Sequence, residues 1–280
     1  MVKSAVKGHQ LTKWTSNKLE ETPDVLAVEE PLEIRLSYWN GTEQIEQPLS
    51  VTMRTPGNDL ELTVGFLFTE GIINSYDEIK SIRHCETVEK EDEKENVVKV
   101  VLNENHTFDL TSLQRNFYTT SSCGVCGKSS IDAISVQCSA ITSNLKTSPK
   151  IISELNEKLR NAQTVFEYTG GLHASALFDA KGILKLLRED VGRHNALDKV
   201  IGAELFDGNL PLFESILLVS GRASFELVQK ATRAGIGIMV AVGAPSSLAV
   251  ELAQKQGITL IGFSKPRSFN IYTHPHRIKV

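Results

Sequence analysis

Apolar and polar residues alternate over residues 32–38, as they do in a strand with one buried face. Asn40 and Gly41 follow with turn chemistry, and residues 44–53 form a second candidate strand. The pattern therefore predicts an antiparallel hairpin. Residues 1–22, by contrast, are polar and show no clear period.

In residues 60–71 the apolar side chains recur with the spacing of a helix. Gly71 lies where a glycine could end this helix as a C-cap. The residues that share one helical face are Leu60, Val64, Leu67 and Phe68. This spacing predicts a core helix that runs from residue 60 to residue 71.

Two further apolar runs, residues 79–88 and 96–102, are typical of strands. The residues between them, 89–95, are all charged and cannot be buried without a large loss of hydration free energy. They are expected to form the solvated tip of a hairpin. The first part of the chain is thus predicted to be a small α+β unit.

From residue 151 onward, helices and short apolar strands follow each other regularly. Such alternation predicts parallel strands joined by crossovers, with ligand sites at the carboxyl ends of the strands. The expected elements are a helix at 151–162, paired strands at 170–179 and 182–190, a helix at 195–206, a strand at 215–220, a helix at 224–234, a strand at 236–242, a Ser-capped helix at 246–256 and a strand at 258–263.

The chain of 280 residues is longer than a comfortable single core of about 150 residues, which favours two domains. Residues 1–118 are assigned to an α+β N-terminal domain. Residues 119–150 form a loop and linker, and residues 151–280 form a layered α/β domain. The fold class is therefore α/β, with a smaller α+β domain at the N-terminus.

The composition is that of an ordinary globular protein, with 41% hydrophobic and 23% charged residues. The net charge of −4 gives no reason to expect nucleic acid as a partner. The N-terminus lacks the apolar run of a secretory signal, and no segment approaches the roughly 18 apolar residues of a membrane span. We expect a cytoplasmic protein with no membrane partner.

Two of the four cysteines, Cys123 and Cys126, lie in the sequence Ser-Ser-Cys-Gly-Val-Cys-Gly at residues 121–127. Their spacing is compatible with half of a zinc site, with a thioredoxin-like redox pair, or with a thiol that carries sulfur as a persulfide. Spacing alone leaves these three interpretations open. Cys85 and Cys138 are expected to be ordinary buried thiols.

Residues 188–199 gather acids, bases, His194 and Asn195 at the entry to a predicted helix. This density is typical of a site, but Asp190 or Asn195 could equally cap the helix while Arg193 and His194 stay solvated. His173, which follows two glycines, could be either a core histidine or a pocket residue.

Three loops follow predicted strands and carry small or cationic residues, at 220–224, 243–247 and 263–268. The last suits a nucleotide head group, with phosphates on Lys265 and Arg267 and a base near Phe263, although a solvated turn would look similar. The residues of this candidate site are Phe263, Ser264, Lys265, Pro266, Arg267 and Ser268.

Several motifs together resemble the FdhD family, the formate dehydrogenase accessory sulfurtransferases. The match runs in order over nearly the whole chain. The motifs are Arg-Thr-Pro-Gly at 54–57, Gly-Phe-Leu-Phe-Thr-Glu-Gly-Ile-Ile at 65–73, the cysteine motif at 121–127, Gly-Gly-Leu-His-Ala at 170–174, Asp-Val-Gly-Arg-His-Asn-Ala-Leu-Asp-Lys at 190–199, Ser-Gly-Arg-Ala-Ser at 220–224 and Thr-Leu-Ile-Gly-Phe at 259–263.

The resemblance implies a sulfur relay from a cysteine desulfurase to the molybdenum bis(molybdopterin guanine dinucleotide) cofactor of formate dehydrogenase. It places the cysteine pair on Cys123 and Cys126, with the persulfide first on Cys123, and the guanine dinucleotide on residues 263–268. It also implies a homodimer. No tightly bound metal is predicted, because no second Cys-x-x-Cys pair is present to complete a zinc site. A non-catalytic chaperone that binds and inserts the cofactor is the alternative.

The family's second domain resembles the cytidine-deaminase fold, so deamination has to be considered. Zinc deaminases need His-x-Glu ahead of Pro-Cys-x-x-Cys, with the glutamate as proton shuttle. Here the cysteines come first, and His173 is followed by Ala174 and Ser175. The sequence therefore argues against deamination.

Overall fold

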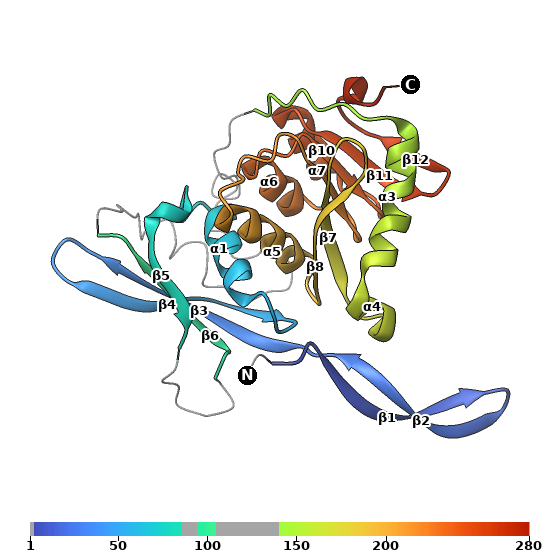
Figure 1. The fold of residues 1–280 in the computed structure, drawn as a ribbon, viewed down its shortest axis with the longest axis horizontal. Helices are drawn as coiled ribbons and strands as arrows, with labels where there is room; N and C mark the ends of the chain where they lie inside the picture. Colours follow the sequence, from blue (N-terminus) through green and yellow to red (C-terminus); the bar gives the residue numbers. More distant parts are fainter. Residues whose placement is uncertain (1–2, 86–93, 105–139, 280) are drawn as a thin grey trace.

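The computed structural model describes residues 3–85, 94–104 and 140–279. Its body holds a four-stranded sheet and a larger six-stranded sheet, with helices between and around them (Figure 1). Cys123, Cys126 and Cys138 lie outside the described residues, as does most of the predicted hairpin tip at 89–95. The mixed α/β class is confirmed.

The four-stranded sheet has the order β4-β3-β6-β5. β3 (Glu30–Trp39) pairs antiparallel with β4 (Gln44–Arg54), so the hairpin predicted from the alternating pattern is confirmed. β5 (Ile79–His84) and β6 (Val97–Leu102) are the two strands predicted on either side of the charged run. They pair antiparallel, and β6 joins the sheet parallel to β3.

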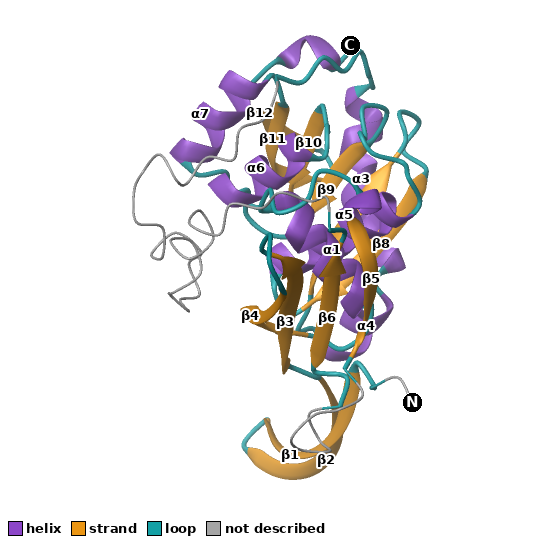
Figure 2. Ribbon diagram, turned by 90° about the vertical axis from the view of Figure 1, so that its left-hand side faces the viewer, coloured by secondary structure: helices purple, strands orange, loops and turns teal. Residues whose placement is uncertain are grey.

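A long hairpin that the pattern does not reveal precedes this sheet. β1 (Val6–Thr15) pairs with β2 (Lys18–Ala27), and the ribbon projects away from the body (Figures 1 and 2). Most of its residues are exposed, so neither face imposes an apolar alternation on the sequence. Trp14 and Leu19 lie opposite each other near its tip, 65% and 71% exposed.

The six-stranded sheet has the order β12-β11-β10-β9-β7-β8. β9, β10 and β11, the strands predicted to be joined by crossovers, are parallel to one another, so that prediction is confirmed. β7 pairs antiparallel with both β8 and β9, and the edge strand β12 pairs antiparallel with β11. Its strands are β7 (His173–Phe178), β8 (Leu184–Asp190), β9 (Ile216–Val219), β10 (Ile238–Ala241), β11 (Thr259–Lys265) and β12 (Ser268–Ile271).

Helices cover both faces of this sheet. Leu155 on α3 packs with Ile216 and Ile238 in one buried cluster, whereas Leu217 and Met239 belong to the cluster on the opposite face. Neighbouring strand residues thus enter opposite cores, as expected for strands buried on both faces. The first face is covered by α3 (Pro149–Ala162), which the short α4 (Thr164–Thr169) follows. The second face is covered by α5 (Arg193–Phe206), α6 (Phe225–Arg233) and α7 (Ser247–Gln256). Two 3-10 turns span Tyr76–Glu78 and Pro275–Arg277.

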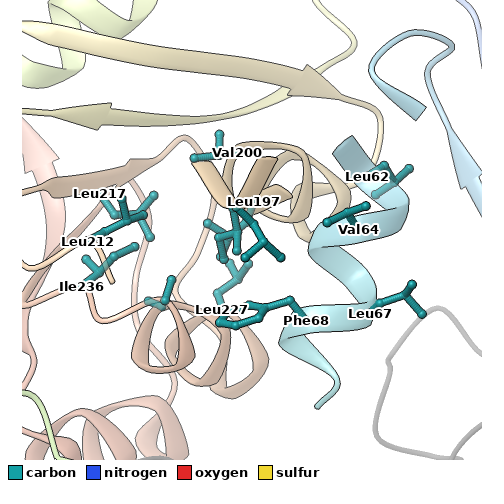
Figure 3. Close-up of a cluster of buried hydrophobic side chains, with 14 of the residues drawn as sticks. Leu62, Val64, Leu67, Phe68, Leu197, Val200, Leu212, Leu217, Leu227 and Ile236 are labelled. Atoms are coloured by element: carbon teal, nitrogen blue, oxygen red, sulfur yellow. The ribbon is translucent and has the colours of Figure 1, made fainter. Parts of the chain in front are cut away.

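The predicted first helix is α1 (Asp59–Thr69), and it lies against α5 (Figure 3). Gly65 and Gly202 mark the crossing. A Cβ added at Gly65 would lie 1.9 Å from the backbone oxygen of Asp198, and one at Gly202 would lie 1.9 Å from that of Glu61. The two helices therefore touch backbone to backbone, which only glycine permits.

This crossing joins the two predicted domains in one buried cluster. Apolar residues of α1, such as Val64 and Phe68, share that cluster with Leu197 on α5 and Leu227 on α6 (Figure 3). The boundaries at residues 1–118, 119–150 and 151–280 stay a prediction. None of the helices in the described ranges is long and apolar enough to cross a membrane.

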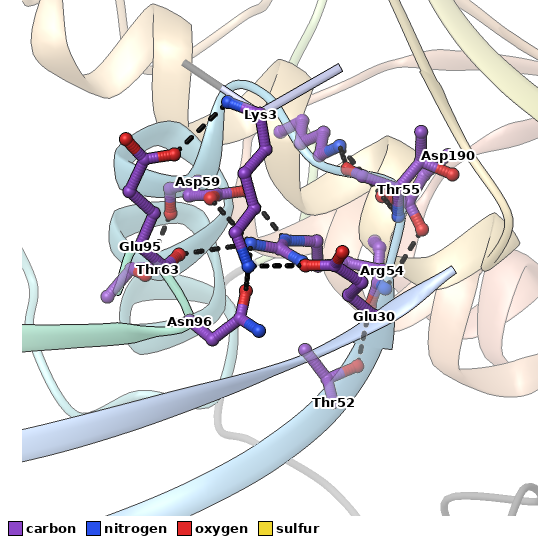
Figure 4. Close-up of polar contacts among 12 residues, drawn as sticks. Lys3, Glu30, Thr52, Arg54, Thr55, Asp59, Thr63, Glu95, Asn96 and Asp190 are labelled. Carbon is purple, nitrogen blue, oxygen red and sulfur yellow. Dashed lines mark hydrogen bonds and ion pairs between the residues drawn. The ribbon is translucent and has the colours of Figure 1, made fainter. Parts of the chain in front are cut away.

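Buried ion pairs fix the end of β4 (Figure 4). The fully buried Arg54 guanidinium donates to both carboxylate oxygens of Asp59, each at 3.0 Å. Next to it, the Thr55 N–H donates to Asp190, whose carboxylate lies 2.7 Å from the Lys199 ammonium. Lys199 in turn donates to the Thr55 carbonyl at 2.9 Å. Paired charges of this kind tolerate burial, so the Arg-Thr-Pro-Gly motif has a structural role.

Candidate functional site

The carboxyl ends of β9, β10 and β11 lie side by side, and each is followed by a loop that the sequence singled out. Ser220 follows β9, Val242 follows β10, and Ser264 is the next-to-last residue of β11. Parallel sheets bind ligands at this edge because their loops converge there. The expectation of a site at the strand ends is thus compatible with the geometry.

The six residues predicted to bind the guanine dinucleotide form the end of β11, the following turn and the first residue of β12. The ladder is irregular between Gly262 and Lys265. Phe263, within this irregular stretch, has a positive φ of 52° and is 42% exposed. Ser264 is fully buried, while Lys265 and Arg267 point two cations to solvent.

A cavity of about 320 Å³ lies next to these strand ends. It is connected to the β11 segment through Asn156, whose Nδ2 donates to the Ser264 carbonyl at 3.3 Å. None of the six predicted dinucleotide residues is among the residues that line it. The lining residues are Asn156, Leu159, Arg160, Gln163, Phe166, Gly170, Gly171, Leu172, His173, Ser220 and Val242.

His173 is a pocket residue rather than a core residue. It lies at the start of β7 in the cavity wall, with Nδ1 3.5 Å from the Ser220 hydroxyl. Burial lowers the pKa of His173, and the nearby Arg193 and His194 lower it further. The ring is therefore neutral at pH 7 and can accept or donate a hydrogen bond without carrying charge.

The polar cluster at residues 188–199 divides into two parts. Asp190 accepts hydrogen bonds from the Gly192 N–H at 2.8 Å and from Asn195 Nδ2 at 3.0 Å, so it stabilises the start of α5. With the Lys199 pair described above, this half of the motif is structural. The N-cap residue of α5 is Gly192 and no side chain caps the helix, so the prediction that Asp190 or Asn195 caps it is wrong. Arg193 and His194 are only partly buried and lie closer to the strand ends.

His194 contacts the start of α6. Its Nε2 lies 3.3 Å from the Ser224 hydroxyl and 3.8 Å from the Glu226 carboxylate. Burial raises the pKa of Glu226, but the His194 ring, the residue's own N–H and the Ser224 hydroxyl outweigh burial and lower that pKa to about 2. Glu226 is thus an ionised partner for His194 down to strongly acidic pH.

This shift predicts a pH dependence of stability. Because the pKa of Glu226 is lower in the folded chain than its ordinary value of 4.5, its ionised form stabilises the fold above pH 4.5, and that contribution is lost as pH falls toward about 2. The variant Glu226→Gln should lack this loss, which we expect to be roughly 2 kcal/mol. Urea unfolding of both proteins between pH 6 and pH 2 measures it.

The matched control is Glu251→Gln, which changes an exposed carboxylate on α7. It should follow the wild-type pH profile throughout. If Glu226→Gln also follows that profile, the His194–Glu226 contact does not stabilise the fold.

A larger cavity of about 730 Å³ lies elsewhere, between the start of α1, β8 and α5. Its wall mixes carboxylates such as Asp59 and Glu204 with cations such as Lys185 and Arg188. Arg188 already forms two hydrogen bonds to the Glu61 carboxylate, at 2.6 and 2.8 Å. We favour the smaller cavity as the functional one because it lies at the ends of the parallel strands.

Sequence reasoning missed the contribution of α3 to this cavity. Asn156, Arg160 and Gln163 are spaced by four and then three residues, so they share one helical face that reaches the strand ends. That polar stripe was the available signal, but it looks the same as the solvated side of any amphipathic helix.

A model of the FdhD/NarQ family matches residues 27–279. The chain belongs to the FdhD/NarQ family. The family resemblance inferred from the motifs is therefore confirmed, and it covers both sheets of the body and the strand-end cavity. The cysteine pair lies outside the described residues, so its role stays a prediction.

Curated members of the FdhD/NarQ family are similar over most of their length. A protein from Streptomyces avermitilis named sulfur carrier protein FdhD is 50% identical over 261 residues, which cover 91% of this chain and 89% of that protein. One of the same name from Sulfolobus acidocaldarius is 47% identical, with 96% and 97% covered.

The fold is also found in a solved structure. A crystal structure described as a formate dehydrogenase accessory protein from Desulfotalea psychrophila superposes with a TM-score of 0.74 at 24% sequence identity. The superposition covers 99% of this chain and all of the other. At this level of identity the comparison establishes the fold.

Proposed function

We propose that this FdhD/NarQ family member carries sulfur as a persulfide on Cys123. The sulfur comes from a cysteine desulfurase and is delivered to the molybdenum bis(molybdopterin guanine dinucleotide) cofactor destined for formate dehydrogenase. Two observations support this: the curated relatives are named sulfur carrier proteins, and a Cys-x-x-Cys motif is present at residues 123–126.

The sulfur transfer balances with the two thiols and an external dithiol that regenerates them. The Cys123 thiolate attacks the outer sulfur of the desulfurase persulfide, and the desulfurase thiolate leaves. Attack of the Cys126 thiolate on the Cys123 sulfur then forms a disulfide and releases the outer sulfur as hydrosulfide. The two thiols supply the two electrons, and a cellular dithiol has to reduce the disulfide before the next cycle.

The observation that carries the cofactor part of the proposal is the donor-rich edge of the six-stranded sheet. Lys265 and Arg267 offer two exposed cations for phosphates, and Phe263 offers an exposed aromatic face. The adjacent cavity is lined by Arg160, Gln163 and further donors, with no carboxylate among its described lining residues. A phosphate-bearing ligand is the class that such a surface suits.

Persulfide transfer has a direct test. We expect incubation with a cysteine desulfurase and cysteine to add one sulfur atom to the peptide that contains Cys123 and Cys126, as measured by mass spectrometry without reductant. The peptide that contains Cys85, a free and partly buried thiol, is the internal control and should keep its mass. An unmodified Cys123 peptide would contradict the proposal.

The proposal extends to location and assembly. Reactive thiols of this kind are maintained in a reducing compartment, so we place the protein in the cytoplasm. A homodimer is the assembly that we expect, and neither nucleic acid nor a membrane is needed for the chemistry.

A further inference from the structure

The pairing of β1 with β2 sorts the side chains of the projecting ribbon onto two faces. The register places Trp14 opposite Leu19, and side chains alternate between the faces along each strand. Polar residues interrupt this order in both strands, so only the pairing reveals it. The apolar side chains gathered on one face are Val6, Trp14, Leu19, Pro23, Val25 and Ala27. The opposite face carries Leu11 and Leu26 among the charged residues Lys7, His9, Lys13, Lys18, Glu20 and Asp24.

The apolar face of the ribbon is uncovered in the single chain. Trp14 and Leu19 are 65% and 71% exposed, and Val6 and Val25 are each 36% exposed. The ribbon projects from the body in both views (Figures 1 and 2). A hairpin of two strands alone is only marginally stable in water and needs a surface against one of its faces. The apolar face is therefore expected to be covered by another molecule.

The edges of the ribbon are poor sites for a third strand. Pro23 in β2 has no N–H to donate to a neighbouring strand, and β1 carries Lys7 and Lys13. Proline and lysine on an exposed edge both oppose the addition of another strand. The covering molecule is thus expected to pack on the face of the ribbon.

A second uncovered apolar patch lies on the outer face of the four-stranded sheet. Thr52 on β4 donates to the Asn195 side chain on α5 at 3.2 Å, so its neighbours Val51 and Met53 point to the opposite face. They are 52% and 47% exposed, and Pro31, which pairs with Met53, is exposed as well. The chain therefore carries two apolar surfaces that it does not cover itself.

The area of the ribbon favours a second copy over an unrelated protein. Each strand has ten residues, so the apolar face is about 30 Å long and about 10 Å wide, or about 300 Å². Covering one such face removes about 600 Å² from water when both partners are counted, which is less than a stable interface needs. Two copies related by a two-fold axis cover two ribbons and remove about 1,200 Å², the lower limit for stable interfaces.

We propose that two copies of the chain exchange their ribbons, so that the apolar face of each ribbon packs on the outer face of the four-stranded sheet of the other copy. The inference rests on the homodimer of the proposed function and names its contact surface. This surface reaches the candidate site. A Cβ added at Gly171, which lines the 320 Å³ cavity, would lie 3.6 Å from Ala27 at the base of the ribbon. The second copy therefore lies beside the cavity rim.

One substitution on each surface tests the contact in the full-length chain. Leu19→Glu places a charge on the ribbon face, and Met53→Lys places one on the sheet face. Both side chains are exposed, so the fold of the single chain should be unchanged. We expect each variant to raise the dissociation constant of the dimer by roughly tenfold or more, as measured by sedimentation equilibrium. The control Lys13→Glu with Glu20→Lys reverses a cross-strand pair on the opposite face and should leave the constant unchanged.

Mixing the two variants tests the reciprocal exchange. In a dimer of two Leu19→Glu chains, or of two Met53→Lys chains, both ribbon contacts are altered. In a mixed dimer, one contact combines the introduced glutamate with the introduced lysine, and the other contact is wild type on both sides. We therefore expect an equimolar mixture to form dimers at concentrations where each variant alone is monomeric.

Three outcomes would overturn the inference. A wild-type chain that sediments as a monomer leaves the ribbon to a different protein. An unchanged dissociation constant in Leu19→Glu or in Met53→Lys places the interface elsewhere, and a mixture that stays monomeric excludes the reciprocal exchange. The sulfur-carrier proposal fails separately, because a monomeric wild type can still gain sulfur on Cys123. A dimer with the expected variant effects but no sulfur on Cys123 overturns that proposal alone.

Discussion

Replacing Cys123 by Ala is expected to abolish the activation of formate dehydrogenase, with a loss of about 100-fold or more. The thiolate is the group that forms and breaks the sulfur–sulfur bond, and no other side chain in the proposal can replace it. Formate oxidation by dehydrogenase produced together with each variant measures the effect. Binding of GDP by the variant should stay at the wild-type level.

Two further variants make this result interpretable. Cys85→Ala changes a partly buried thiol directly after β5 and should leave activation unchanged. Cys126→Ala should still accept sulfur on Cys123 but release it poorly. If Cys123→Ala keeps full activation, the protein is a chaperone that inserts the cofactor, and sulfur transfer is excluded.

The variant Gly65→Ala is expected to destabilise the fold by about 3 kcal/mol or more. Helix propensity alone predicts the opposite sign, because alanine is favoured over glycine inside a helix by about 1 kcal/mol. The added Cβ, however, would lie 1.9 Å from the Asp198 carbonyl oxygen. That atom is backbone inside α5, so the helices have to move apart and the shared core opens. Urea unfolding followed by far-UV circular dichroism measures the loss.

Gly8→Ala is the matched control. Gly8 lies in β1, and a Cβ there would meet no described atom within 4 Å. Its effect should stay within about 0.5 kcal/mol. Equal stability of Gly65→Ala and wild type would mean that α1 and α5 do not touch at this crossing.

The elements that could be predicted from sequence are those in which burial of one or both faces imposes a regular spacing of apolar residues. The apolar runs of β9 and β10 are buried on both faces, and Leu155 and Leu159 on α3 are core residues at helical spacing. The β1–β2 ribbon could not be predicted in this way. Its strands have no core to face, and so nothing in their order of residues distinguishes them from a polar tail.

The candidate site was predictable in part. The residues 263–268 follow a strand that is visible in the sequence, so their place at the sheet edge follows from topology. Gln163 and Asn156 reach the same edge only because α3 packs across the sheet, and this contact between distant segments leaves no local mark. Asp190 and Lys199, by contrast, are typical of a site in the sequence but form a buried structural ion pair. Structural ion pairs and catalytic clusters use the same residue types, so the sequence does not distinguish them.

The exposed ribbon determines which spectroscopic signals report on folding. The chain has two tryptophans, Trp14 near the ribbon tip and Trp39 at the end of β3, and they are 65% and 40% exposed. Intrinsic tryptophan emission should therefore be red-shifted in the folded monomer and change little when the apolar core melts. It should instead respond when the ribbon is covered, which makes Trp14 fluorescence a built-in reporter of contacts made by that arm.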